Sequence, residues 1–107
     1  METVSRRQGG DWLVSVSGRI TIDSSPVLRM LLLQHLESVG CELLTVDLYE
    51  VLYVDTSGLA VLLEVLKAAR ARKKTFSLSG LRDRPRYLLE ATRILHLFHE
   101  VARDVPQ

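Results

Sequence analysis

The segment Asp55-Thr56-Ser57-Gly58 places a carboxylate and two hydroxyls beside a glycine, directly before an apolar run with helical spacing. Asp, Ser and Thr favour helix starts because their side-chain oxygens accept hydrogen bonds from the unpaired N–H groups of the first turn. The same N–H groups and the positive end of the helix dipole attract anions such as phosphate. Local chemistry therefore leaves two interpretations open: an ordinary helix cap, or a phosphate acceptor and docking point.

Catalysis by Ser57 is not predicted. A Gly-x-Ser-x-Gly nucleophile elbow needs glycine where this chain has Asp55 and Leu59. The candidate bases are distant histidines at positions 35, 96 and 99. His96 and His99 are three residues apart without further ligands, which does not predict a metal site. The chain also lacks a glycine-rich phosphate loop, so we expect no catalytic residue, no metal and no cofactor.

Size and composition restrict the remaining functions. A chain of 107 residues is expected to form one domain, spanning 1–107, around one core. A net charge of +1 and an aromatic content of 6% argue against nucleic acid as a partner. Cys41 is the only cysteine, which excludes an intrachain disulfide and a thiolate metal cluster. Residues 1–7 lack an apolar signal core, and no run approaches the ~18 apolar residues of a membrane helix, so a cytoplasmic protein without membrane insertion is expected.

The elements that must position the Ser57 segment can be read from hydrophobic periodicity. Strands are predicted over residues 3–8, 12–17, 43–48, 75–79 and 97–101, the first two forming a hairpin and the third buried on both faces. Helices are predicted over residues 23–38, 57–72 and 85–92. This alternation implies an α/β domain with right-handed crossovers, in which helices pack on a mostly parallel central sheet of four or five strands.

Two helix faces carry specific expectations. The helix over 57–72 has an apolar arc wider than a sheet-packed helix needs, from Leu59, Leu62, Leu63, Leu66 and Ala69 to Val61, Val65 and Ala68. Its extra width indicates either packing on the first helix or a partner-binding surface. For the third helix, Tyr87, Leu88 and Ala91 are predicted to form the inner face.

Three blocks of sequence, at 16–23, 46–59 and 86–98, follow one another in an order that resembles the STAS domain of bacterial anti-sigma-factor antagonists. The first block contains Ser17-Gly18-Arg19 and leads to Asp23, and the middle block contains the specific turn Val54-Asp55-Thr56-Ser57-Gly58-Leu59. The sequence departs from the family at Arg93, where many members have glycine, and in its short tail after Phe98.

The resemblance implies a binding switch centred on Ser57 as the phosphoacceptor. Unphosphorylated, the domain would bind an anti-sigma factor that is also an ATP-dependent serine kinase, freeing a sigma factor; phosphorylated, it would release that partner until a serine phosphatase restores it. Asp55, Thr56, Gly58 and Leu59 would form the motif and contact the partner, with Gly58 admitting a partner's backbone. Asp23 and Ser24 are expected at the rim of this interface, although helix capping also explains them.

A second function fits the same residues. The stretch Asp55-Thr56-Ser57-Gly58-Leu59-Ala60 is similar to the Asp-Thr-x-Gly-Leu-Ala turn of small STAS subunits that bind lipid-transport ABC ATPases. In such a non-switching subunit Thr56 would be the contact residue. A scaffold in a larger signalling assembly is the third possibility. None of these functions is enzymatic, and each is compatible with a monomer or a weak dimer.

Overall fold

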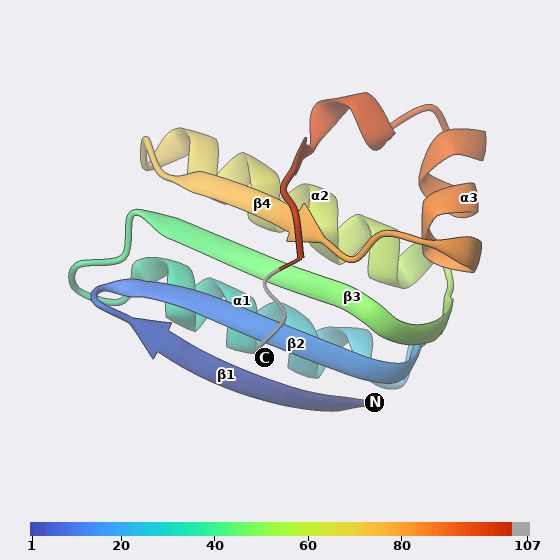
Figure 1. Ribbon diagram of the computed structural model, residues 1–107, viewed down its shortest axis with the longest axis horizontal. Coiled ribbons are helices and arrows are strands. Elements are labelled where there is room, and N and C mark those ends of the chain that lie inside the picture. The colour runs from blue at the N-terminus through green and yellow to red at the C-terminus, as the bar shows by residue number, and fades with distance from the viewer. Residues whose placement is uncertain (104–107) are drawn as a thin grey trace.

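The computed structural model describes residues 1–103, which fold into a five-stranded sheet with three helices (Figure 1). The sheet has the order β1-β2-β3-β4-β5, and only β1 and β2 run antiparallel. The strands are β1 (Glu2–Gln8), β2 (Asp11–Ile20), β3 (Leu43–Val54), β4 (Thr75–Ser79) and β5 (His99–Glu100). The helices are α1 (Ser25–Glu37), α2 (Thr56–Ala71) and α3 (Asp83–Ala91), followed by a short 3₁₀ turn, η1 (Leu95–Leu97). The predicted α/β class, the mostly parallel sheet and the N-terminal hairpin are confirmed.

The hairpin turn depends on glycine at two adjacent positions. Gly9 has a φ of +63°, a conformation that costs glycine little. A Cβ on Gly10 would lie 2.0 Å from the carbonyl oxygen of Gly40, so a side chain there would force two backbones apart. The turn after β1 and the loop after α1 are therefore packed against each other.

The helices α1 and α2 cover one face of the sheet and leave the other face open (Figure 1). Two right-handed crossovers, β2-α1-β3 and β3-α2-β4, step in the same direction across the sheet, which places both helices on the same side. The prediction that residues 43–48 are buried on both faces is therefore confirmed only in part: Leu44 and Val46 are fully buried under the helices, whereas on the open face Leu43 and Thr45 are half-buried and Asp47 is 5% exposed.

The wide apolar arc of α2 is covered within the chain. Val61 and Val65, on the side of the arc, are buried, and α2 packs along α1. The interpretation that the extra width packs on the first helix is confirmed.

The inner face of α3 differs from the prediction. Pro85 and Leu89 are buried, whereas Tyr87 is 68% exposed and Ala91 is exposed. The helix has nine residues, and so short a segment does not define by its apolar spacing which face points to the core. The predicted inner face differs from the observed one by about one residue, or ~100° around the helix axis. Tyr87 consequently lies on the surface.

Arg93 occupies the left-handed position that ends α3, with a φ of 60°. Arg93 N–H donates to the Glu90 carbonyl and Ile94 N–H donates to the Leu89 carbonyl, which is the Schellman arrangement that favours glycine. We expect Arg93→Gly to raise the free energy of unfolding by about 0.5–1 kcal/mol, since relief of left-handed strain exceeds the extra entropy of glycine. Thermal denaturation should show a Tm several degrees higher, and Arg93→Ala, which keeps the strain, should show no gain. An unchanged or lower Tm for Arg93→Gly would contradict this.

His35 links α1 to the hairpin, and its environment is expected to make stability depend on pH. Its ring stacks on Trp12 with centroids 4.0 Å apart, and its Nε2 lies 2.8 Å from the Ser5 hydroxyl. Burial, and secondarily the nearby Arg7 charge, hold the pKa of His35 below its ordinary value. Because the unfolded chain binds this proton more readily, stability should be full above the unfolded pKa of about 6.5 and fall as the pH drops below it. Urea unfolding at pH 7.5 and 5.5 should show this loss, and His35→Gln should reduce it; equal pH dependence in both proteins would exclude His35 as the cause.

Among the described residues, none of the helices has the length and apolar character needed to cross a bilayer.

Candidate functional site

Asp55 joins the end of β3 to the start of α2 as the N-cap residue. Its Oδ1 accepts hydrogen bonds from the backbone N–H groups of Ser57 at 2.9 Å and Gly58 at 3.3 Å. Its Oδ2 accepts from the Ile22 N–H at 3.1 Å, and its own N–H donates to the Ile20 carbonyl. One carboxylate thus caps α2 and ties it to the loop between β2 and α1.

The electrostatics of the turn keep Asp55 ionised. The Ser57 hydroxyl is the main cause that holds the pKa of the Asp55 carboxyl below its usual value, with the N–H groups of Gly58, Ser57 and Ile22 adding to it. Partial desolvation opposes the shift without reversing it. The carboxylate is therefore charged at neutral pH and lies directly beside the Ser57 hydroxyl.

Ser57 and Thr56 are placed differently in this turn. The Ser57 hydroxyl donates to Asp55 Oδ1 at 2.5 Å, and the residue is half-buried, while Thr56 is exposed. A phosphate on Ser57 Oγ would remove the donated proton and compete with Asp55 for the N–H groups of Ser57 and Gly58. The N–H groups of the turn suffice to bind one anion. A phosphate on Ser57 would therefore lie close to the Asp55 carboxylate and compete with its negative charge.

Gly58 and Leu59 face inward. A Cβ on Gly58 would lie 2.5 Å from Val54 Cγ2 and 2.9 Å from Ile20 Cγ2, and Leu59 is 5% exposed. The close approach that Gly58 allows is therefore internal, between α2 and the ends of β2 and β3. The structure gives these two residues a packing role that holds the turn in place, and their expected contact with a partner stays a prediction.

The loop between β2 and α1 brings Asp23 and Ser24 beside this turn through the Ile22–Asp55 hydrogen bond. Asp23 is exposed; Ser24 is the N-cap residue of α1, but its side chain makes no cap hydrogen bond to the helix. Instead, the Ser24 hydroxyl accepts from the Thr21 N–H at 3.0 Å and so shapes the loop. Ile22, which is 72% exposed, was not singled out from the sequence. The sequence feature that could have identified Ile22 is its place as an apolar residue between the polar Thr21 and Asp23, just before a helix.

A groove runs from the turn to α3. Asp55 and Thr56 line it on one side, and Arg84, Tyr87 and Leu88 line it on the other. Arg84 and Tyr87 were not predicted at the site, since their position depends on how α3 packs across the end of β3. The one sequence signal is Pro85, which places Arg84 in the first turn of a helix at the same edge of the sheet.

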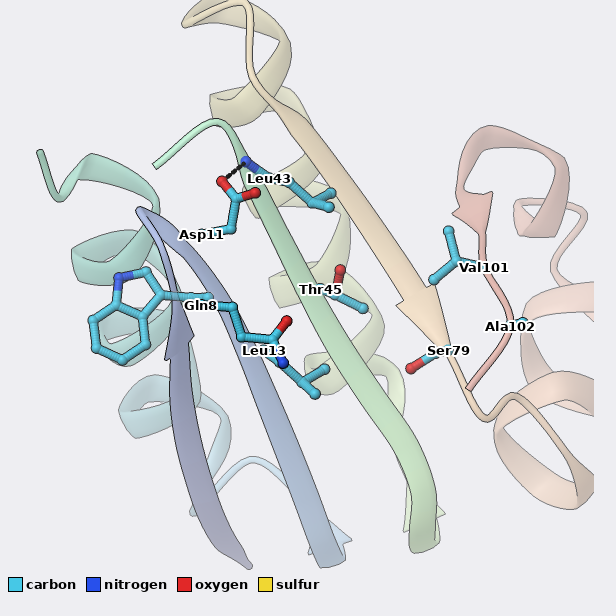
Figure 2. A pocket seen from close by; sticks show the side chains of 9 residues that line it. Gln8, Asp11, Leu13, Leu43, Thr45, Ser79, Val101 and Ala102 are labelled. Atoms are coloured by element: carbon cyan, nitrogen blue, oxygen red, sulfur yellow. Dashed lines mark hydrogen bonds between the residues drawn. The ribbon is translucent and has the colours of Figure 1, made fainter. Parts of the chain in front are cut away.

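A second hollow lies on the open face of the sheet, around Leu13, Leu43 and Thr45 (Figure 2). Its carboxylate, Asp11, accepts hydrogen bonds from the N–H groups of Leu43 at 2.9 Å and Glu42 at 3.0 Å, the first of which is drawn in Figure 2. These bonds fix the start of β3 beside the hairpin turn. The carboxylate of this hollow therefore stabilises the fold, and the candidate site remains the turn at Ser57.

Comparison with known proteins identifies the fold and the family. A family model described as "Mlab, STAS domain" matches residues 4–99. The crystal structure of an anti-sigma factor antagonist from Mycobacterium paratuberculosis is 21% identical with a TM-score of 0.82, over 92% of this chain and 83% of that one. A putative anti-sigma factor antagonist from Thermotoga maritima is 12% identical with a TM-score of 0.84, over 96% and 87%. The Bacillus cell fate determinant SpoIIAA, solved in its phosphorylated form, is 9% identical with a TM-score of 0.74, over 94% and 91%.

Proposed function

The chain belongs to the STAS domain family, and we propose that it is an anti-sigma-factor antagonist whose binding to an anti-sigma serine kinase is switched by phosphorylation of Ser57. The observation that carries the proposal is the placement of the Ser57 hydroxyl. It lies half-buried in the first turn of α2, hydrogen-bonded to the ionised Asp55. A single covalent change at this oxygen alters the charge and the hydrogen bonds of the whole turn.

In the unphosphorylated form the turn offers a compact surface to a partner. Thr56 is exposed at its centre, and the exposed apolar side chains of Ile22 and Tyr87 lie on the loop and the helix beside it. Apolar and aromatic side chains surrounded by polar groups are typical of protein interfaces. Asp23 and Ser24 extend this surface as its proposed rim.

Phosphorylation would work against binding through charge. The partner kinase transfers the γ-phosphoryl group of its ATP to Ser57 Oγ; the O–H proton leaves the hydroxyl and ADP leaves the kinase. The new group brings about −1.5 to −2 charges next to Asp55. A partner surface complementary to one carboxylate then meets two anions, which repel it or leave it imperfectly paired. Hydrolysis by a serine phosphatase would return the original surface.

The fold is expected to survive this modification. The N–H groups at the start of α2 point toward the added charge and can bind phosphate oxygens in place of Asp55. The SpoIIAA structure in its phosphorylated form has the same fold as this chain, which supports a STAS domain that tolerates phosphate. The switch then acts at the interface and requires no second conformation of the domain.

The direct test is the mass of the protein purified from its native host across growth phases, with the modified residue mapped by peptide fragmentation. We expect an added phosphate on Ser57 in at least one phase, and its loss in a Ser57→Ala strain. Thr56→Val is the matched control, since it removes the neighbouring hydroxyl and should leave the phosphate in place. Ser57 unmodified in every phase would contradict the switch and favour a constitutive binding module.

A further inference from the structure

Two tyrosines of β3 are covered by four arginines from three segments: β2, the start of α3 and the segment after β5. The Cζ atoms of Arg82 and Arg103 lie 3.7 and 4.2 Å from the ring centroid of Tyr49. The surface formed in this way, here termed the arginine–tyrosine surface, comprises Arg19, Tyr49, Tyr53, Arg82, Arg84 and Arg103. It concentrates four positive charges in a chain whose net charge is only +1.

Tyr53 contacts the other two arginines of this surface, Arg19 and Arg84. The Cζ atoms of Arg19 and Arg84 lie 4.4 and 5.1 Å from the ring centroid of Tyr53. Within residues 1–103, neither of them forms an ion pair, and both are exposed. A guanidinium held against a ring has lost part of its freedom, and its N–H groups still point outward in the plane, ready for a bidentate carboxylate.

The remaining two arginines are committed to the fold. Arg103 Nε donates to Asp47 Oδ2 at 3.1 Å, and the side chain of Asp47 is 7% exposed. Arg82 Nε donates to the Tyr49 carbonyl at 3.0 Å. These contacts hold Tyr49 and the start of α3 in position, so the binding capacity of the surface lies mainly with Arg19 and Arg84.

The arginine–tyrosine surface reaches the Ser57 turn. Tyr53 and Arg84 line the same groove as Asp55 and Thr56. A protein that covers the turn would therefore also cover the guanidinium of Arg84 and, through Tyr53, approach that of Arg19.

We propose that the arginine–tyrosine surface binds a carboxylate-rich segment of the protein partner that contacts the Ser57 turn. The inference rests on the proposed function, because it assigns a second contact to the same partner. Carboxylates fit better than nucleic acid here for two reasons. The tyrosine rings already face guanidiniums and are not available for base stacking. Asp83, whose side chain is 82% exposed, also separates Arg82 from Arg84, so the surface offers discrete cations and no continuous track for a phosphate backbone.

The test uses a fluorescein-labelled deca-glutamate peptide as the probe, with binding measured by fluorescence anisotropy at low salt. The double variant Arg19→Gln/Arg84→Gln removes two cations that form no ion pair within residues 1–103, so its fold should be preserved, and circular dichroism and the Tm check this. We expect it to bind the peptide at least tenfold more weakly than the unaltered protein. The control, Lys67→Gln/Lys73→Gln, removes two exposed charges from α2 and its C-terminal turn and should change the affinity less than twofold.

Three results would overturn the proposal: no measurable binding of the peptide by the unaltered protein, equal losses in both double variants, or tighter binding of a labelled ten-nucleotide dT strand than of the peptide. The last result would reassign the surface to nucleic acid. The assay contains no kinase and no phosphorylated protein. Its failure therefore leaves the Ser57 proposal untouched, and an unmodified Ser57 in the mass analysis leaves this result untouched.

Discussion

Ser57→Asp is expected to weaken binding of the proposed anti-sigma kinase partner by at least 100-fold, which corresponds to about 2.7 kcal/mol of binding free energy. The substitution removes the hydroxyl that donates to Asp55 and sets a second carboxylate against the first. A partner surface that is complementary to one carboxylate cannot pair with two adjacent anions at the start of α2. Isothermal titration calorimetry with the kinase and ATP analogue would measure the loss.

Two further variants separate charge from shape in this experiment. Ser57→Ala removes the hydroxyl without adding charge and should retain most of the affinity. Thr56→Arg alters the exposed neighbour, and in a non-switching subunit it is the change that should disrupt an ATPase complex. Undiminished kinase binding by Ser57→Asp would exclude the switch, whatever the Thr56 variant does.

Gly58→Val is expected to lower the free energy of unfolding by about 3 kcal/mol, a large share of the stability of a typical small domain. The first atom of the new side chain would lie 2.5 Å from Val54 Cγ2 and 2.9 Å from Ile20 Cγ2. Both neighbours are β-branched and stiff, so α2 itself must move away from the sheet. Urea denaturation measures the change.

Ala60→Val is the control for this substitution, because it introduces the same side chain into the same helix at an exposed position. It should lower stability by well under 1 kcal/mol, the helix-propensity difference alone. Equal stabilities of the two variants would show that Gly58 is not required for packing. A large loss of stability in the Gly58 variant alone would show that packing within the domain requires the glycine of the motif.

The sequence predicts those contacts of the site that form between residues close together in the chain. Asp55 precedes Thr56, Ser57 and an apolar helix, so its role as N-cap follows from local chemistry, and the structure confirms it with hydrogen bonds to Ser57 and Gly58. The general fold was predictable for a similar reason, because strand and helix periods alternate clearly along the chain.

The parts not predicted depend on how distant segments meet. The strand expected over residues 43–48 continues to Val54. The prediction missed this continuation because β3 contributes an extra residue at two places in its pairing with β2. These register shifts leave Leu52 exposed and break the alternation that marks a strand. The rotation of α3, which puts Tyr87 beside the turn, follows from burial of Pro85 and Leu89. The stacking of arginines on Tyr49 and Tyr53 likewise has no local signature.

The ion pair between Arg103 and Asp47 also bears on the order of synthesis. The two residues are 56 positions apart, and the segment that carries Arg103 runs back across the open face of the sheet (Figure 1). During translation the Asp47 carboxylate can accept hydrogen bonds from the Tyr49 N–H and the Ser79 hydroxyl before Arg103 has been made, but its buried negative charge has no counterion until then, which is costly. Nascent chains arrested before residue 103 clears the ribosome should be digested by protease much faster than chains arrested later. Neutralisation of the buried Asp47 charge on the ribosome thus waits for Arg103.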